Sequence, residues 1–254
     1  MRSVEHAVRT AYLRALVGAF ATKPPSSPPD WQRGSHRLLF IRDDGIGDLV
    51  LSLEVMRAIA GAAPGITLDI LCSPQNARLK RFLSFAGEVL VHERGSLRRS
   101  IRTWRALGRR GYDAVIDGRV SMTSVNPQTA SLILSTRAPW RVGLGGRHNA
   151  HIYSLPVAAP DATNAVELVA ALAAPFGVDV RAHDWRPKLS LTTAERGTAQ
   201  AAWMKAGASP PRVLVNYSAG TSERQWPAAR MSALRKFHRR RTFRTAAYVH
   251  YRTR

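Results

Sequence analysis

The stretch Arg37–Ala60, RLLFIRDDGIGDLVLSLEVMRAIA, decides the fold class of this chain. It starts with the apolar run Leu38–Ile41, whose residue types are those of a buried β-strand. A polar, glycine-containing segment, Arg42–Asp48, interrupts the run. Apolar residues then recur at helical spacing as far as Ala60. The stretch therefore predicts a strand, a tight turn and a helix.

The turn of this stretch is also the first candidate site. It contains Gly45 and Gly47, and it places Asp48 at or near the start of the helix. Open α/β sheets bind their ligands at the carboxyl ends of the strands, which is where this turn lies. We therefore expect a ligand-binding crevice beside Asp48.

The composition places the chain among globular proteins. It has 254 residues, 45% of them hydrophobic, which is enough to form one or two cores despite a formal net charge of +21. No window approaches the roughly 18 consecutive apolar residues that a membrane span requires. The single cysteine, Cys72, excludes an internal disulfide framework and is most simply a small buried residue in a reducing compartment.

Residues 1–22 predict an amphipathic, mildly basic helix. Its expected apolar face consists of Val4, Val8, Tyr12, Ala15, Leu16 and Ala19. This face either docks on the chain's own domain or lies on an anionic membrane surface, and the sequence leaves both alternatives open. Residues 23–35 contain four prolines and predict a stiff, extended linker.

Residues 36–190 predict a parallel sheet with helices on both faces, because strand and helix patterns alternate along them. After the opening strand and helix, further strands are expected at 66–72, 88–92, 114–117 and 141–144, and further helices at 75–85, 97–107, 126–134 and 163–176. The passage that follows residue 144, as far as Pro160, is less regular.

Residues 191–234 begin a second unit, with a helix at 193–206, a strand at 212–216 and another helix from Trp226. The strand leads into NYSAGTSERQWP (Asn216–Pro227), whose backbone N–H groups can face a phosphate. The candidate phosphate-binding residues are Ser218, Gly220, Thr221, Ser222 and Arg224. An ordinary loop with Pro227 in the first helical turn is the alternative.

The two stretches together resemble glycosyltransferase family 9, the ADP-heptose:lipopolysaccharide heptosyltransferases. The resemblance rests on G-I-G-D-L-V-L-S-L after the first strand and N-x-S-A-G-x-x-x-R-x-W-P about 170 residues later. It covers roughly Arg37–Leu234, with supporting matches at Pro64-Gly65, at Arg141–Leu144 and around Asn164–Leu172. It implies an α/β protein of GT-B type, with a Rossmann-like acceptor domain and an incomplete Rossmann-like donor domain.

The resemblance also implies roles for the site residues. Asp48 matches the family's proposed catalytic base, which takes the proton of an acceptor hydroxyl during transfer with inversion, and Gly45 and Gly47 form the acceptor-side loop. Helix capping is the alternative role for Asp48. Arg224 stands where the family usually carries a lysine that meets the donor phosphates. Glu54 stands where the family typically has proline, and it is expected to perturb the first helix.

No metal or cofactor is expected. Asp43 and Asp44 lie close to Asp48 in the sequence, but turn-forming aspartates are common and need no metal. The implied partners are a nucleotide-sugar, ADP-heptose by the resemblance, and lipopolysaccharide core or another saccharide as acceptor. The implied location is cytoplasmic, with peripheral contact to the cytoplasmic face of the inner membrane as a further expectation.

Residues 235–254 differ in composition from the rest of the chain, with eight Lys or Arg and no acidic residue. Complete members of the family continue well beyond this point with the rest of the donor domain. The tail is therefore interpreted as the product of a truncated gene or a shifted reading frame. In that case residues 191–234 form a lone βα unit with no sheet to join.

Two other function classes stay open. The chain could be an inactive remnant that binds only the acceptor. It could instead be a basic protein that binds nucleic acid or membrane surfaces without specificity. The arginines behind this second alternative are Arg94, Arg98, Arg99, Arg102, Arg105, Arg109 and Arg110, on and around one predicted helix. A solvated helix face is the simpler explanation of these arginines, and no aromatic ladder or recognition helix indicates specific nucleic-acid binding.

Overall fold

The computed structural model describes residues 2–93, 95–120, 125–146, 149, 151–161, 164–207, 213–215, 226–227, 229–230, 233 and 246–248. The chain divides into two units, Met1–Leu189 and Ser190–Arg254, and each is described by itself. Among the described helices, none is both long and apolar enough to cross a bilayer.

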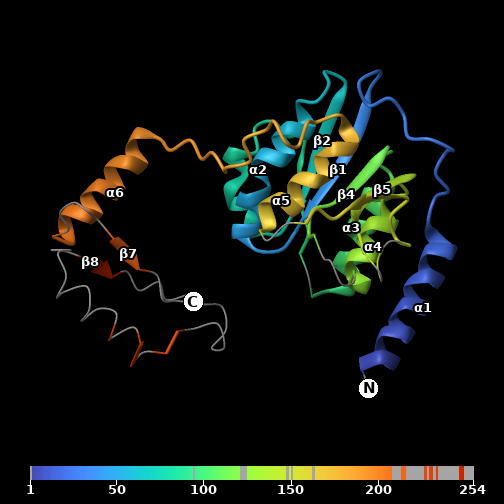
Figure 1. Cartoon of the computed structure of the whole chain (residues 1–254), viewed down its shortest axis with the longest axis horizontal. Coiled ribbons are helices and arrows are strands. Elements are labelled where there is room, and N and C mark those ends of the chain that lie inside the picture. Colours follow the sequence, from blue (N-terminus) through green and yellow to red (C-terminus); the bar gives the residue numbers. More distant parts are fainter. Residues whose placement is uncertain are drawn as a thin grey trace. The chain divides into compact units, whose positions relative to one another are not determined.

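The first unit is built on a six-stranded sheet in the order β3-β2-β1-β4-β5-β6, and every neighbouring pair is parallel (Figure 1). The strands are β1 (His36–Arg42), β2 (Ile66–Cys72), β3 (Val89–Val91), β4 (Ala114–Asp117), β5 (Trp140–Gly145) and β6 (Leu155–Ala158). This is the strand order of a Rossmann fold. The predicted α/β class with a parallel, Rossmann-like sheet is therefore confirmed.

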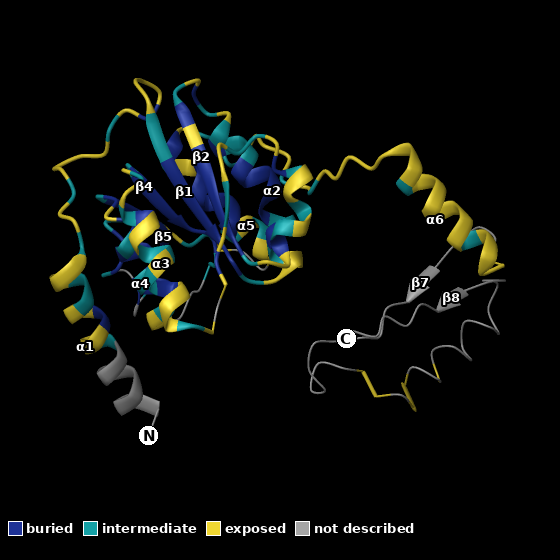
Figure 2. Cartoon of the chain, turned by 180° about the vertical axis from the view of Figure 1, so that it is seen from behind, coloured by how far each residue is buried: buried dark blue, intermediate teal, exposed yellow. Residues whose placement is uncertain are grey.

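Helices cover both faces of this sheet (Figure 1). They are α2 (Ile46–Ala60), α3 (Leu97–Gly108), α4 (Pro127–Ser135) and α5 (Ala165–Ala170), with the 3₁₀ helices η1 (Asn76–Phe82) and η2 (Ala171–Phe176). The N-terminal helix α1 (Arg2–Phe20) packs on α4. Successive residues of β1 point to opposite faces. Leu38 and Phe40 therefore join the core under α2, α5 and η2, whereas Leu39 and Ile41 join the core under α1, α3 and α4. The central strands are buried on both faces (Figure 2).

Most element boundaries agree with the sequence to within two residues, but three predictions differ. The helix expected at 75–85 is the shorter 3₁₀ helix η1. The helix expected at 163–176 is α5 followed by η2, and η2 contains Pro175, which cannot donate an α-helical hydrogen bond. The irregular passage before Pro160 contains β6, an edge strand of four residues that includes Pro156.

The N-terminal helix α1 docks on the first unit, as one of the two alternatives predicted, but its predicted face is wrong. Leu13 is the buried residue, and Leu16 and Val17 pack at the edge of the same core. Tyr12, Ala15 and Ala19, which were expected to face inward, are exposed. The inward face is therefore rotated by about one residue from the predicted one.

Two further features depart from expectation. Trp31, within the expected linker, is buried, and its ring centroid lies 5.2 Å from that of Phe176. Glu54 does not perturb α2, which is continuous from Ile46 to Ala60. The Glu54 carboxylate is buried, pairs with Arg57 and accepts a hydrogen bond from the backbone N–H of Lys188 at 3.2 Å. It ties α2 to the end of the first unit.

The second unit contains α6 (Thr193–Lys205), which starts with a capping box between Thr192 and Glu195. Its β7 (Val213–Val215) pairs in parallel with β8 (Ala246–Tyr248). The expectation of a lone βα unit without a sheet is therefore wrong, because a strand from the basic tail pairs with β7. Of the helix expected from Trp226, the structure describes only a few residues, of which 229, 230 and 233 are helical.

Candidate active site at the carboxyl edge of the sheet

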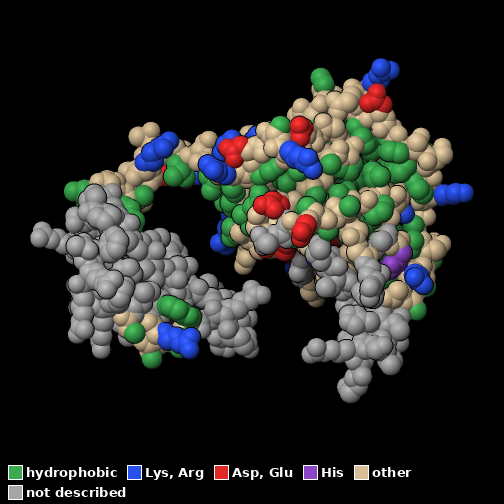
Figure 3. All heavy atoms as spheres, viewed as in Figure 1, with side chains coloured by type: hydrophobic (Ala, Val, Ile, Leu, Met, Phe, Trp, Pro, Cys, Tyr) green, Lys and Arg blue, Asp and Glu red, His purple; other side chains and the backbone are tan. Residues whose placement is uncertain are grey.

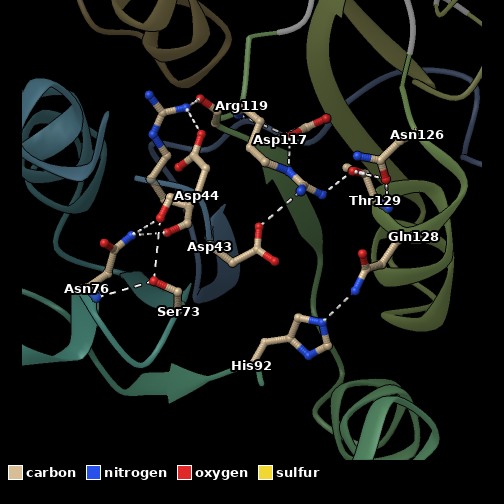
Figure 4. Close-up of polar contacts among 12 residues, drawn as sticks. Asp43, Asp44, Ser73, Asn76, His92, Asp117, Arg119, Asn126, Gln128 and Thr129 are labelled. Carbon is tan, nitrogen blue, oxygen red and sulfur yellow. Dashed lines mark hydrogen bonds and ion pairs between the residues drawn. The ribbon is translucent and has the colours of Figure 1, made fainter. Parts of the chain in front are cut away.

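The candidate site lies at the topological switch point of the sheet, where β1 and β4 are neighbours and their crossover connections leave in opposite directions. Asp43 and Asp44 follow β1, and Arg119 follows β4. Figure 4 shows Asp43 directed towards Arg119, while Asp44 is turned away from it, towards Arg42. We call the set Arg42, Asp43, Asp44, Asp117 and Arg119 the switch-point cluster.

Asp48 lies beside the switch-point cluster, in the first turn of α2. Gly45 is the N-cap residue of that helix, so Asp48 does not occupy the capping position that was its alternative role. Its side chain is 48% exposed, and Oδ1 lies 3.7 Å from Nη2 of Arg42. A carboxylate in this position can accept a proton from a bound hydroxyl group.

The two glycines of the acceptor-side loop differ in what they permit. A methyl group on Gly45 would lie 2.9 Å from Oδ2 of Asp48, so the missing side chain gives the carboxylate its room. A methyl group on Gly47 would meet nothing within 4 Å. A side chain at Gly45 would therefore displace the Asp48 carboxylate, whereas one at Gly47 would not.

Arg42 holds the first turn of α2 against the sheet. The side chain is 1% exposed. Its Nε donates to the backbone oxygen of Asp48 at 3.0 Å, its Nη1 donates to the backbone oxygen of Gly118, and Asp44 lies 3.3 Å away. Burial lowers the pKa of Arg42 and raises that of Asp44, while their mutual attraction opposes both shifts. One buried guanidinium thus links β1, α2 and β4.

Arg119 organises the other half of the switch-point cluster. Its Nη1 lies 3.2 Å from Asp43, its Nε lies 3.9 Å from Asp117, and Nη2 donates to the hydroxyl group of Thr129. The hydroxyl group of Tyr153 donates to Asp117 at 2.9 Å. Burial raises the pKa of Asp117, and Arg119 opposes this shift. Each acidic group of this half is therefore paired.

The loop after β1 is also held from β2. Asn76 donates through Nδ2 to the backbone oxygens of Arg42 at 2.9 Å and Asp44 at 3.2 Å. Ser73 donates to the Asp44 backbone oxygen at 3.4 Å. On the far side of the cluster, Nε2 of His92 lies 3.5 Å from Nε2 of Gln128 (Figure 4). The bonds from Asn76 and Ser73 hold the loop that leads from β1 to Asp48.

Asp43 and Asp44 pair with arginines. Across the residues with described positions, no group of three His, Cys, Asp or Glu side chains is arranged to hold a metal ion.

The predicted donor residues lie outside the part of the chain that the structure describes. They are Ser218, Gly220, Thr221, Ser222 and Arg224. Of the stretch that contains them, only Trp226 and Pro227 are described, and Trp226 is about half exposed.

Sequence reasoning missed three residues of the site, Arg42, Asp117 and Arg119, although it noted the two aspartates that follow β1. A signal for them was present, since Arg42 and Asp117 each end an apolar strand run. Charged residues at the carboxyl ends of parallel strands meet at one edge of the sheet.

Comparison with known proteins supports the same fold and adds a family. The family model of glycosyltransferase family 9 (heptosyltransferase) matches residues 100–246. No curated protein matches the chain.

Solved structures of this family have the same fold. A glycosyl transferase family 9 protein from Veillonella parvula DSM 2008 is 17% identical with a TM-score of 0.60, covering 86% of this chain and 62% of that one. The E. coli ADP-heptose lps heptosyltransferase II is 16% identical with a TM-score of 0.56, covering 84% and 63%. E. coli heptosyltransferase WaaC with ADP is 19% identical with a TM-score of 0.50, covering 80% and 63%. The present chain thus spans less than two thirds of the length of each.

The family model matches more than half of the 254 residues. Its match begins in α3 and ends at the first residue of β8, so it includes both the second half of the Rossmann-like sheet and the predicted donor stretch. This chain belongs to glycosyltransferase family 9.

Proposed function

We propose that this protein is a glycosyltransferase of the heptosyltransferase type. It transfers a heptose or related sugar from a nucleotide-sugar, ADP-heptose, to a saccharide acceptor of the lipopolysaccharide-core class. The family match and the position of Asp48 beside the switch point support this proposal. The main observation behind the proposal is that the carboxylate of Asp48 is half exposed. The backbone oxygen of Asp48 accepts hydrogen bonds from Arg42 and Ser52, which hold the residue in place.

In the proposed reaction, Asp48 removes the proton of an acceptor hydroxyl group as the oxygen attacks the anomeric carbon of the donor. The attack comes from the face opposite the diphosphate, so the bond to the diphosphate breaks and the configuration inverts. The protonated Asp48 then returns its proton to solvent. Arg42 positions Asp48, since it bonds the backbone of that residue.

The donor role is proposed for Ser218, Gly220, Thr221, Ser222 and Arg224 on sequence grounds. Hydroxyl groups, backbone N–H groups and a guanidinium stabilise the negative charge that develops on a leaving diphosphate. No metal or other cofactor takes part in this proposal.

A transfer assay with the full chain tests the role of Asp48. ADP release is measured with ADP-heptose and a lipopolysaccharide-core acceptor, and ADP binding is measured by calorimetry. Asp48→Asn should lower kcat by about 100-fold or more, as expected for a lost general base, while ADP binding is unchanged. Asp161→Asn, an exposed aspartate outside the cluster, is the matched control. Full activity of Asp48→Asn would contradict the proposed role.

The same titration tests the donor site. Arg224→Ala should weaken ADP binding, whereas Asp48→Asn should not. If the folded wild-type chain binds no ADP, the transferase proposal is wrong and an acceptor-binding protein is the better description.

We also propose a cytoplasmic location with peripheral contact to the cytoplasmic face of the inner membrane. The support is the excess of basic residues, 38 Lys and Arg against 17 Asp and Glu, because anionic lipids attract basic surfaces.

A further inference from the structure

A groove with an apolar floor lies where α1 packs beside α3 and α4. Its volume is about 610 Å³. The floor includes Leu16, Trp104 and Leu134. Tyr12 and Phe20 flank it from α1 and are 51% and 64% exposed. We call this the α1 groove.

The aromatic wall of the α1 groove follows from the helical repeat. Tyr12, Leu16 and Phe20 are spaced by four residues, so they lie on one side of α1. Leu13 on the adjoining side is buried and fixes the helix to the unit. Large apolar side chains on a free protein surface mark a contact site when they gather around a groove.

Arginines border the α1 groove. Arg98, Arg102, Arg105 and Arg109 recur at intervals of three or four residues along the exposed side of α3, over about 16 Å. We call them the α3 stripe. Arg105 and Arg109 line the α1 groove, and the exposed Arg137 approaches it from the end of α4.

The α3 stripe differs from other basic positions of the first unit. On the face shown in Figure 3, Lys and Arg side chains are interspersed with Asp and Glu side chains. No acidic residue is among the described side chains that line the α1 groove, and the four stripe arginines form no ion pair with any other residue that the structure describes. The neighbouring Arg99 and Arg110, by contrast, pair with Glu93 and Glu88. The stripe is therefore free to meet an anionic surface.

The end of α1 that carries Phe20 is held in place by hydrogen bonds. The hydroxyl group of Thr22 donates to the backbone oxygen of Arg137 at 2.8 Å. The backbone oxygen of Thr22 accepts from Nη1 of Arg141 at 2.9 Å. The α1 groove is thus a fixed part of the first unit.

We propose that the α1 groove and the α3 stripe together bind the surface of an anionic phospholipid bilayer. The stripe contacts lipid phosphates, while Tyr12 and Phe20 enter the boundary between headgroups and acyl chains. This inference rests on the proposed peripheral membrane contact, to which it assigns a surface, and it does not depend on sugar transfer.

Charge and apolar character together favour this occupant. An anionic bilayer supplies phosphates for the α3 stripe and acyl chains for the apolar floor. A nucleic acid supplies the phosphates, and its bases can stack on aromatic side chains, but it has no aliphatic chains to fill the apolar floor. A second copy of the chain would bring a protein of the same net charge, +21, against an unpaired basic stripe.

Vesicle sedimentation with the full chain tests the proposal. The vesicles contain phosphatidylethanolamine and phosphatidylglycerol at 7:3, or phosphatidylcholine alone, and no saccharide acceptor, so the result is independent of transfer activity. The wild type should bind the anionic vesicles and not the neutral ones. The double variant Arg105→Gln, Arg109→Gln should weaken binding to the anionic vesicles about thirty-fold, because each arginine near the membrane surface contributes about fivefold to the affinity.

An apolar variant and a charge-matched control complete the design. Phe20→Ser should weaken binding about tenfold through lost apolar burial, without changing net charge. Arg78→Gln with Arg181→Gln removes the same charge from exposed positions away from the α1 groove and should change binding less than about twofold. All these side chains are exposed, and thermal unfolding checks that each variant is folded.

The outcomes separate the two proposals. If the wild type does not bind anionic vesicles, both the membrane contact and the groove assignment are wrong. If it binds but the charge-matched control weakens binding as much as the groove variant, the contact is real and the groove assignment is wrong. The assignment of the α1 groove to membrane binding also fails if the groove variants bind single-stranded DNA more weakly than the wild type does but bind vesicles with unchanged affinity.

Discussion

Replacing the buried guanidinium of Arg42 by an apolar side chain of similar length, Arg42→Met, is expected to lower the free energy of unfolding of the first unit. Arg42 is 1% exposed and is bonded to the backbone oxygens of Asp48 and Gly118 and to the carboxylate of Asp44. Each buried acceptor left without a donor costs about 1–3 kcal/mol, and breaking a buried ion pair costs about 3–5 kcal/mol. These contributions overlap, so we expect a loss of about 3–5 kcal/mol.

Urea denaturation followed by tryptophan fluorescence measures this loss, since Trp31 and Trp140 are buried in the same unit. The control is Arg33→Met, whose ion pair with Asp30 is exposed to solvent on both sides and should contribute little. A loss below about 1 kcal/mol in Arg42→Met would refute this expectation, because the Asp44 carboxylate and the Gly118 carbonyl group both lose their Arg42 partner. The Asp48 carbonyl group keeps its hydrogen bond from Ser52 and is not counted.

Three further predictions concern single positions. Gly45→Ala places a methyl group 2.9 Å from Oδ2 of Asp48 and should lower the transfer rate about tenfold by displacing the carboxylate. Gly47→Ala should retain the wild-type transfer rate. Equal rates of the two variants in steady-state assays would argue against this packing. Burial raises the pKa of Asp117, so above about pH 4 the folded protein binds more protons at this residue than the unfolded chain does. The free energy of unfolding of the wild type therefore falls as the pH rises towards the raised pKa. Asp117→Asn lacks this titration, so its stability relative to wild type in urea should increase from pH 4 to pH 7, and a constant difference would contradict the shift. Burial raises the pKa of Cys72 to about 11, so at pH 8 about one thiol in a thousand is ionised, and Ellman's reagent should react only after unfolding; rapid reaction of the native protein would contradict the burial.

The sequence was sufficient for the elements whose signal is local. The run Leu38–Ile41 and the helical repeat after Asp48 predicted β1 and α2, because buried parallel strands are continuously apolar and their covering helices are amphipathic. In contrast, β6 is an edge strand of four residues whose pattern is too short to separate from a loop.

Other features depend on contacts that no local pattern contains. The inward face of the first helix was assigned around Tyr12, but Leu13 is the buried residue, because docking depends on the surface of α4 that the helix contacts. Glu54 was expected to disturb α2 and instead bonds Lys188, 134 residues along the chain. The pairing of Arg42 with Asp44 and of Arg119 with Asp43 likewise depends on the strand order, which brings β1 beside β4.

The two hydrogen bonds of Thr22 have a consequence for experiments on shorter chains. A chain cut to begin at Lys23 loses the acceptor that Arg141 uses and the donor bonded to the backbone oxygen of Arg137. It also uncovers the core around Leu13. A deletion of α1 would therefore damage the packing of α4 and β5 while it removed the aromatic wall, and a loss of vesicle binding could not be assigned to either effect. Point substitutions on the outer side of α1 keep the two effects separate.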